Sequence, residues 1–159
     1  MARIDFSKDA RNEAICLTKL ILLSWKKWKK QAGEKNINLQ LQIPTDVTVL
    51  GDPLYLEVIL DNLFSNAIKY GKENGNVQAS WNETSKALSI TDDGIGIPVK
   101  DLPNIFNRFY RADESRSSAI KGNGLGLSIV KKLADLQHIN LRTESQPDHG
   151  STFRLQFPS

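Results

Sequence analysis

The chain has 159 residues, of which 40% are hydrophobic and 25% are charged, a balance typical of a folded globular protein rather than a disordered or fibrous one. The net charge of +3 is too small to indicate a nucleic-acid-binding surface. One cysteine excludes an internal disulfide bond, and together with two histidines it offers little for a zinc site. Because the lone cysteine needs no oxidising compartment, we expect a domain of the reducing cytoplasm. The longest apolar run falls far short of the roughly 20 residues of a membrane-spanning helix.

The first third of the chain predicts a helix followed by two strands. Apolar residues recur at steps of four and three from Ala10 to Ala32, which predicts one long helix with a buried stripe. Apolar and polar residues then alternate over 37–43, the period of a half-buried strand, and residues 47–50 are expected to supply its partner.

A cluster of basic and aromatic residues lies within that first helix. The lysine-rich segment 26–30 beside Trp25 and Trp28 has two interpretations: a nucleic-acid or membrane-surface patch, or a solvated outer face. We favour the second because both tryptophans fall on the apolar stripe. We therefore predict neither nucleic-acid binding nor direct membrane contact.

The middle of the chain predicts a second helix and a hairpin. Asp52 is a good N-cap, Pro53 a good first helical residue and Gly71 a good stop, so the helix should span about 53–70. Alternating apolar residues over 77–81 and 88–90, separated by a polar turn, then predict an antiparallel hairpin.

The last third contains an unusually long connection. Residues 92–123 are rich in Gly, Pro, Ser and charges, and a connection of this length is expected only for a functional segment. A helix over 125–136 and a hairpin of 139–144 with 151–157 close the chain. We predict a single domain over 1–159 of the α+β class: a two-layer sandwich with the main helices on one face of a mixed, mostly antiparallel sheet.

One helix face carries unusual polar residues. In LDNLFSNAIKYG, Asn62, Asn66 and Lys69 share one face of the second helix, and Tyr70 flanks it. Carboxamide oxygens suit a hard cation such as Mg²⁺ and do not repel a triphosphate, while Lys69 supplies positive charge. A merely solvated helix face explains this segment alone equally well.

Two glycine-containing segments suggest a ligand close to the backbone. In ITDDGIGI, Gly94 and Gly96 permit close approach, and Asp92 at the strand end can accept a hydrogen bond from the adenine amine while repelling the carbonyl of guanine. A simple Asx-stabilised turn is the commoner explanation of one such pair. In KGNGLGLSIV, glycines precede a predicted helix, whose N-terminus favours phosphate, although they can equally form a hinge.

Taken in order, LDNLFSNAIKYG, DDGIGI, IFNRFYRAD, KGNGLGL and GSTF resemble the N, G1, F, G2 and final glycine boxes of two-component sensor histidine kinases. The resemblance covers about 52–157 and implies the Bergerat-type ATP-binding fold, with three main helices on one face. It also implies ATP and Mg²⁺ as cofactors, a parent protein anchored in the cell membrane, and a mobile ATP lid over about 98–121.

The resemblance assigns the site residues as follows. Asn66, with Asn62, is expected to ligate Mg²⁺, and Lys69 with Arg108 or Arg111 to approach the phosphates. Tyr70 and Ile97 would border the base, Asp92 would bind its amine beside Gly94 and Gly96, and Thr152 would help on the adenine side. The residues expected to close over the triphosphate are Gly122, Gly124, Leu125, Gly126 and Leu127. The lid anchors are Phe106, Phe109 and Tyr110.

The same resemblance indicates the reaction. ATP-hydrolysing relatives place a Glu general base where this chain has Asn62, which favours transfer to a nucleophile that needs less activation, such as imidazole. We expect transfer of the γ-phosphoryl group to a histidine on a separate dimerisation domain, then relay to a response regulator. The acceptor motif is absent, so this chain should be monomeric and should not autophosphorylate. A protein-serine kinase of the anti-sigma type and a degenerate nucleotide-binding module remain the alternatives.

Overall fold

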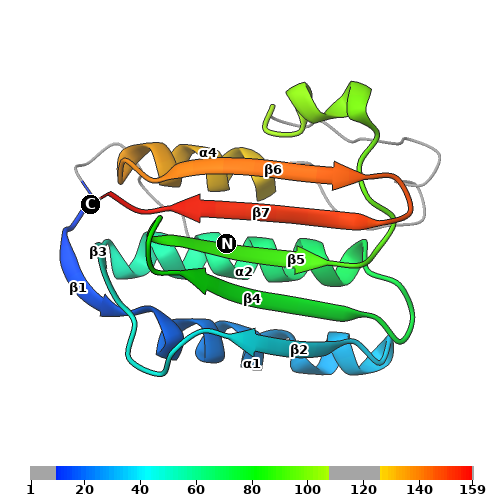
Figure 1. Ribbon diagram of the computed structural model, residues 1–159, viewed down its shortest axis with the longest axis horizontal. Helices are drawn as coiled ribbons and strands as arrows, with labels where there is room; N and C mark the ends of the chain where they lie inside the picture. Colours follow the sequence, from blue (N-terminus) through cyan, green and yellow to red (C-terminus); the bar gives the residue numbers. More distant parts are fainter. Residues whose placement is uncertain (1–9, 108–125, 159) are drawn as a thin grey trace, which may run out of the picture.

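A five-stranded sheet covered on one face by helices forms the body of the molecule, in a computed structural model that describes residues 10–107 and 126–158 (Figure 1). The predicted α+β two-layer arrangement is confirmed. The strands are β1 (Glu13–Cys16), β2 (Asn38–Gln42), β3 (Thr48–Gly51), β4 (Asn76–Asn82), β5 (Ala87–Asp92), β6 (Asn140–Gln146) and β7 (Gly150–Gln156). The helices are α1 (Leu17–Glu34), α2 (Pro53–Lys69) and α4 (Gly126–Leu136), with a 3₁₀ helix η1 (Val99–Asn104).

The sheet is mixed and mostly antiparallel, in the order β2-β4-β5-β7-β6. Only the β2–β4 pair within it is parallel. Both predicted hairpins, β4–β5 and β6–β7, are confirmed. In register, Ile90 lies opposite Ala79 on one side and Phe153 on the other, so these buried residues face the helices from three adjacent strands.

Two predictions for the N-terminal third were wrong. The segment Glu13–Cys16 is strand β1 rather than helix, and α1 begins at Leu17. Strand β3 pairs antiparallel with β1, not with β2, and together they form a separate two-stranded sheet. The periodicity misled because Ala14, which fits the helical stripe, is exposed, whereas Ile15 is buried. Alternation identifies a strand but not its partner.

Helix α2 is the centre of the helical layer, and its predicted extent is confirmed. Asp52 caps its N-terminus by accepting hydrogen bonds from the amides of Leu54 (3.0 Å) and Tyr55 (3.2 Å). The helix packs against α1 on one side and α4 on the other, as Figure 1 shows. Its Phe64 is fully buried and meets the ring of Trp25 edge-on at 5.3 Å. Burial on several sides explains the nearly continuous apolar sequence of this helix.

The outer surface of the helical layer is polar around the predicted lysine-rich segment. Lys27 forms an ion pair with Asp61 of α2 at 3.0 Å, and Trp25 and Trp28 are partly buried against the core. A membrane-spanning helix is not found among residues 10–107 and 126–158, whose helices lack the necessary length or apolar character.

Candidate nucleotide-binding site

The candidate site lies at the end of the sheet where β5 finishes and β7 begins, which we call the Asp92 end. Asp92 is the last residue of β5 and lies opposite Ser151 of β7. Only 6% of Asp92 is exposed, although it is a carboxylate, and its Oδ1 accepts a hydrogen bond from the amide of Gly94 at 2.9 Å. Burying a carboxylate costs free energy. A buried carboxylate at a strand end is therefore a candidate for a functional group, such as one that recognises a hydrogen-bond donor.

The environment of Asp92 changes its protonation. Burial raises the pKa of Asp92 to about 6, because desolvation disfavours the charged carboxylate. Backbone hydrogen bonds from Gly94 and Ser151 act in the opposite direction, and the nearby Asp93 raises the pKa further. At neutral pH the group remains mainly ionised and can therefore accept a hydrogen bond from an amine.

The loop after β5 approaches other backbone segments so closely that glycine is required. A Cβ atom at Gly94 would lie 2.0 Å from the carbonyl oxygen of Tyr70, at the end of α2. Gly96 has a φ of +72°, and a Cβ there would lie 2.0 Å from the carbonyl oxygen of Gln146. No side chain fits either position, so both predicted glycines hold the loop between α2 and the β6–β7 turn.

Hydrogen bonds fasten the same loop on both sides. The amide of Ile95 donates to the carbonyl of Tyr70 at 3.1 Å, and the carbonyl of Ile95 accepts from the amide of Asp148 at 2.7 Å. The amide of Ile97 donates to the hydroxyl of Ser145 at 2.7 Å. The loop that follows Asp92 is thus attached to the helix that carries the two asparagines, which places both halves of the site in one rigid unit.

The neighbouring carboxylate, Asp93, has a different role. Its two oxygens accept hydrogen bonds from the amide of Asn76 at 3.0 and 3.1 Å, at the start of β4. Asp93 therefore fixes the start of a strand, while Asp92 points to the helix side. The sequence alone did not distinguish these roles.

The polar face of α2 is placed beside the start of α4. Asn62 and Asn66 are partly buried, and Lys69 is exposed. The amide nitrogen of Asn62 donates to the carbonyl of Val58 at 2.7 Å, which turns its Oδ1 toward Gly126. A Cβ atom at Gly126 would lie 2.9 Å from that oxygen, so glycine makes room for it.

This arrangement fits the predicted Mg²⁺ chemistry. The Oδ1 of Asn62, a suitable metal-ligand atom, faces Gly126 at the start of α4. The N-terminal end of such an 11-residue helix favours phosphate. Among the residues that the structure describes, no group of three or more His, Cys, Asp or Glu side chains is suited to hold a metal ion. The Mg²⁺ prediction therefore depends on the carboxamides and on phosphate oxygens.

Several predicted site residues lie outside the described residues. They are Arg108, Phe109, Tyr110, Arg111, Gly122, Gly124 and Leu125. Of the others in the glycine box, Gly126 and Leu127 form the first turn of α4 and are partly buried. Phe106, a predicted lid anchor, packs edge-on against Phe153 of β7 at 6.5 Å.

The structure does not bring Thr152 to the other predicted site residues. Its hydroxyl lies 2.9 Å from that of Thr91, on the open face of the sheet. Successive side chains of a strand alternate, so Ser151 shares the face of Asp92 and Phe153. Ser151 is buried, and the sequence analysis did not single it out. Counting back from the apolar Phe153 in steps of two places it on the face of Asp92.

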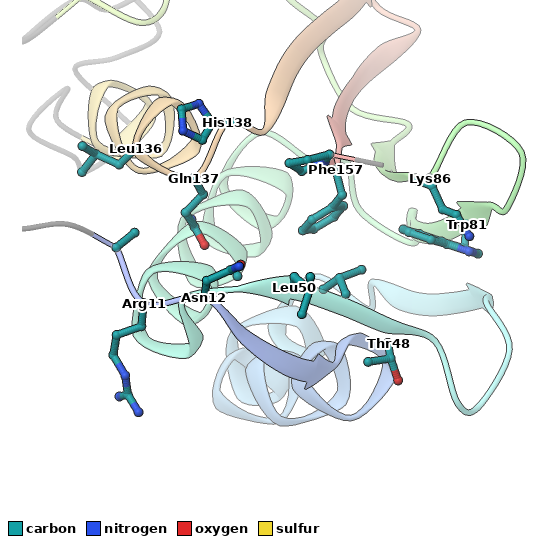
Figure 2. Close-up of a pocket in the computed structure, with 14 residues that line it drawn as sticks. Arg11, Asn12, Thr48, Leu50, Trp81, Lys86, Leu136, Gln137, His138 and Phe157 are labelled. Carbon is teal, nitrogen blue, oxygen red and sulfur yellow. The ribbon is translucent and has the colours of Figure 1, made fainter.

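One cavity walled by described residues lies elsewhere. It has a volume of about 680 Å³ and lies near the turn between β4 and β5, at the opposite end of the sheet, which we call the Lys86 end. Figure 2 shows it between Leu136 at the end of α4, Gln137 and His138 just after that helix, Leu50 of β3, and Phe157 beyond β7. None of the predicted site residues lines it.

The fold and this site define an ATP-binding domain, and comparison with known proteins gives its family. Residues 51–159 match the family described as "Histidine kinase-, DNA gyrase B-, and HSP90-like ATPase". The chain belongs to this family, and within it the chain is homologous to the catalytic domains of sensor histidine kinases.

Three known proteins illustrate the relationship. The sensor-like histidine kinase SenX3 of Mycolicibacterium smegmatis is 36% identical over 148 residues, covering 92% of this chain and 38% of SenX3. The mycobacterial sensor histidine kinase MprB has a TM-score of 0.78 at 26% identity, covering 93% of this chain and 99% of the solved one. Full-length ShkA in complex with AMPPNP has a TM-score of 0.76 at 26% identity, covering 99% of this chain and 32% of ShkA. This chain thus spans well under half the length of SenX3.

Proposed function

We propose that this domain binds Mg²⁺ and ATP at the Asp92 end and transfers the γ-phosphoryl group to a histidine on a dimerisation domain of its parent protein. Two observations carry the proposal: the loop after the buried Asp92 is attached to the end of α2 at Tyr70, and Asn62 of α2 faces Gly126 at the start of α4. A response regulator would receive the phosphoryl group afterwards.

In this proposal the base is recognised by the loop after β5. Asp92 accepts a hydrogen bond from the adenine amine, and the backbone of Gly94 and Gly96 forms one wall. Tyr70 and Ile97, both partly buried, border the base. We assign to Ser151 the role on the adenine side that the sequence gave to Thr152, because Ser151 shares the face of Asp92. The related full-length ShkA was solved in complex with AMPPNP, which supports a nucleotide as the ligand of this domain.

The phosphates would lie between α2 and the start of α4. Asn66 and Asn62 would hold Mg²⁺, which neutralises charge on the phosphates. Lys69 is exposed and would reach the phosphates beside α2. The proposed phosphate-binding residues also include Arg108 and Arg111, which lie outside the described residues and are proposed from the sequence alone. Catalysis of this kind depends on positioning and charge neutralisation rather than covalent chemistry.

The local carboxylates favour transfer over hydrolysis. On α2, Asn62 stands where the ATP-hydrolysing relatives have their general base, and a carboxamide cannot act as one. The adjacent Asp61 is held on the α1 side: it accepts a hydrogen bond from Ser24 at 2.5 Å and pairs with Lys27 at 3.0 Å. A neutral imidazole needs no such base, which is why we infer histidine as the acceptor. Because ATP is a cytoplasmic metabolite, we place the domain on the cytoplasmic side of a membrane-anchored parent.

The test is a transfer assay with γ-labelled ATP, Mg²⁺ and the separately purified dimerisation domain of the parent protein. We expect acid-labile, base-stable label on that domain, lost with Asn66→Ala and retained with Asn140→Ala, a matched control at an exposed asparagine on β6. Acid-stable label on serine would instead make the protein a serine kinase. Tight ATP binding without any transfer would leave only a nucleotide-binding module.

A further inference from the structure

The hydroxyl of Ser145 on β6 has hydrogen-bond partners in two other segments of the Asp92 end: the loop after β5 and the start of β7. It accepts a hydrogen bond from the amide of Ile97 at 2.7 Å. It lies 3.0 Å from the carbonyl oxygen of Gly150, to which it can donate, and 2.8 Å from the hydroxyl of Ser151. It therefore ties the loop after β5 to the start of β7.

Ser145 is connected indirectly, through Ser151, to Asp92, the group proposed to recognise the base. Ser151 lies opposite Asp92 in the sheet and donates a backbone hydrogen bond that lowers the pKa of Asp92. Ile97 lies on the other side of the proposed base site, five residues after Asp92 in the chain. Ser145 itself is only partly exposed and has no contact with Asp92 among its hydrogen bonds.

A hydroxyl group has one proton but two lone pairs. Ser145 can therefore donate either to the carbonyl of Gly150 or to the hydroxyl of Ser151, but not to both at once. When Ser145 donates to the carbonyl oxygen of Gly150, the hydroxyl of Ser151 must donate to Ser145 if the hydrogen bond between the two serines is to be kept. When it donates to Ser151, the proton of Ser151 is free for another acceptor.

We propose that Ser145 is a positioning residue for nucleotide binding: it fixes Ile97 relative to Asp92, and it directs the hydroxyl of Ser151 toward the bound nucleotide. This inference rests on the proposed nucleotide site. Nucleotide binding would select the pattern in which Ser145 donates to Ser151, because only that pattern leaves Ser151 a donor for the ligand or for a water beside it.

The first consequence concerns affinity. Ser145→Ala removes the acceptor of the Ile97 amide and the partner of Ser151, so the Kd for Mg²⁺-ATP should rise about tenfold, the effect of losing one or two neutral hydrogen bonds. Ser145→Thr keeps the hydroxyl and should restore affinity to within about threefold of the original. Ser89→Ala is the matched control, because Ser89 lies on β5 opposite Arg154 on the open face.

The decisive measurement is a double-mutant cycle on the Kd for Mg²⁺-ATP, by calorimetric titration of the full chain. If Ser145 acts through Ser151, the effect of Ser145→Ala should shrink from about tenfold to about threefold or less when Ser151 is already Ala. An equal effect in both backgrounds, or no effect in either, would overturn the inference. If Ser145→Ala does not fold, Ser145→Cys, with a weaker acceptor, replaces it in the same cycle.

Failure of the inference is distinguishable from failure of the proposed function. If the unmodified chain does not bind ATP, the proposed site is wrong and the cycle has no meaning. If it binds ATP and the Ser145→Ala variant binds equally well, the site stands and Ser145 is only structural. Exchange of the Ile97 amide proton, slow in the unmodified chain and fast in Ser145→Ala, reports directly that the hydrogen bond has been removed.

Discussion

The two ends of the sheet are built in different ways. At the Asp92 end, backbone segments meet directly, and the loop after β5 is fixed by hydrogen bonds that it donates to Tyr70 and Ser145 and accepts from Asp148. At the Lys86 end, side chains such as Leu50 and Phe157 surround a cavity of about 680 Å³. The comparison shows that the proposed site is at the more tightly built end of the sheet, which suits recognition by groups held in fixed positions.

The largest expected effect is a loss of stability when glycine is replaced by alanine, and one glycine at each end of the sheet allows the two ends to be compared. Gly150 has a φ of +94°, and a Cβ there would lie 2.0 Å from the carbonyl oxygen of Asp92, so Gly150→Ala should lower the free energy of unfolding by about 3–5 kcal/mol. At Gly51, a Cβ would meet side-chain atoms of Gln137 at 3.0 Å and Leu56 at 3.1 Å. Because these atoms can shift, Gly51→Ala should cost only about 1 kcal/mol. Urea unfolding measures both, and similar losses would contradict the comparison.

The second prediction uses the protonation of Asp92. Its pKa of about 6 lies above the ordinary value of 3.8, so the folded state binds the proton more tightly than the unfolded state. The charged form therefore costs stability above about pH 6, and this cost disappears as the pH falls toward 4. Asp92→Asn keeps an acceptor for the amide of Gly94 and should be more stable than the unmodified protein by about 1–3 kcal/mol at pH 8.

The check is urea unfolding of both proteins without nucleotide from pH 8 to pH 4. The advantage of Asp92→Asn should shrink steadily below pH 6. A constant difference over the whole range would mean that the carboxylate of Asp92 is not destabilised by burial.

The third prediction concerns the end of α2 that holds the loop. The Nζ of Lys35 lies 2.9 Å from the carbonyl oxygens of Ile68 and Lys69 and 3.2 Å from that of Gly71. A cation that satisfies the last carbonyls of a helix stabilises it, so Lys35→Met should cost about 1–2 kcal/mol. Thermal unfolding provides the measurement.

The matched control for Lys35 is Lys131, whose exposed ion pair with Asp135 lies within α4. Lys131→Met should change stability by less than about 0.5 kcal/mol. Equal losses in the two variants would show that the charge, rather than the capping geometry, is what matters.

The smallest effect is expected at the Lys86 end. Leu50 is 60% exposed and lines the cavity, so Leu50→Ser should change stability by less than about 0.5 kcal/mol. Because the site lies at the other end of the sheet, the Kd for ATP should also stay within about twofold of its original value. A clear loss of ATP affinity, measured by titration, would mean that the two ends are coupled.

Sequence reasoning succeeded where local signals are strong. Helix α2 was predicted almost to the residue, because Asp52, Pro53 and Gly71 mark its ends and its apolar face is continuous. The two hairpins followed from alternation and turn residues. Strands β1 and β3 were misassigned because their pairing joins Ala14 to Leu50, distant positions that no local pattern connects.

The sequence suggested the candidate site residues but not the contacts that support them. Asp92, Asn62 and Gly94 were proposed because their residue types can carry the chemistry. Ser145 and Ser151 could not be separated from other serines, because their roles depend on cross-strand register and on hydrogen bonds to distant backbone atoms. The placement of Thr152 on the open face was unforeseen for the same reason, since a shift of one position moves a side chain to the other face.

The most direct test of the central claim is a calorimetric titration of the chain with ATP and with GTP, each with and without Mg²⁺, repeated for Asp92→Asn. We predict saturable, Mg²⁺-dependent binding of ATP, at least tenfold weaker binding of GTP, and a loss of at least thirtyfold in ATP affinity for the variant, the effect of removing a charged hydrogen-bond acceptor. Equal affinity for ATP and GTP, or an Asp92→Asn variant that binds ATP as well as the original, would contradict the assignment of the adenine site to Asp92.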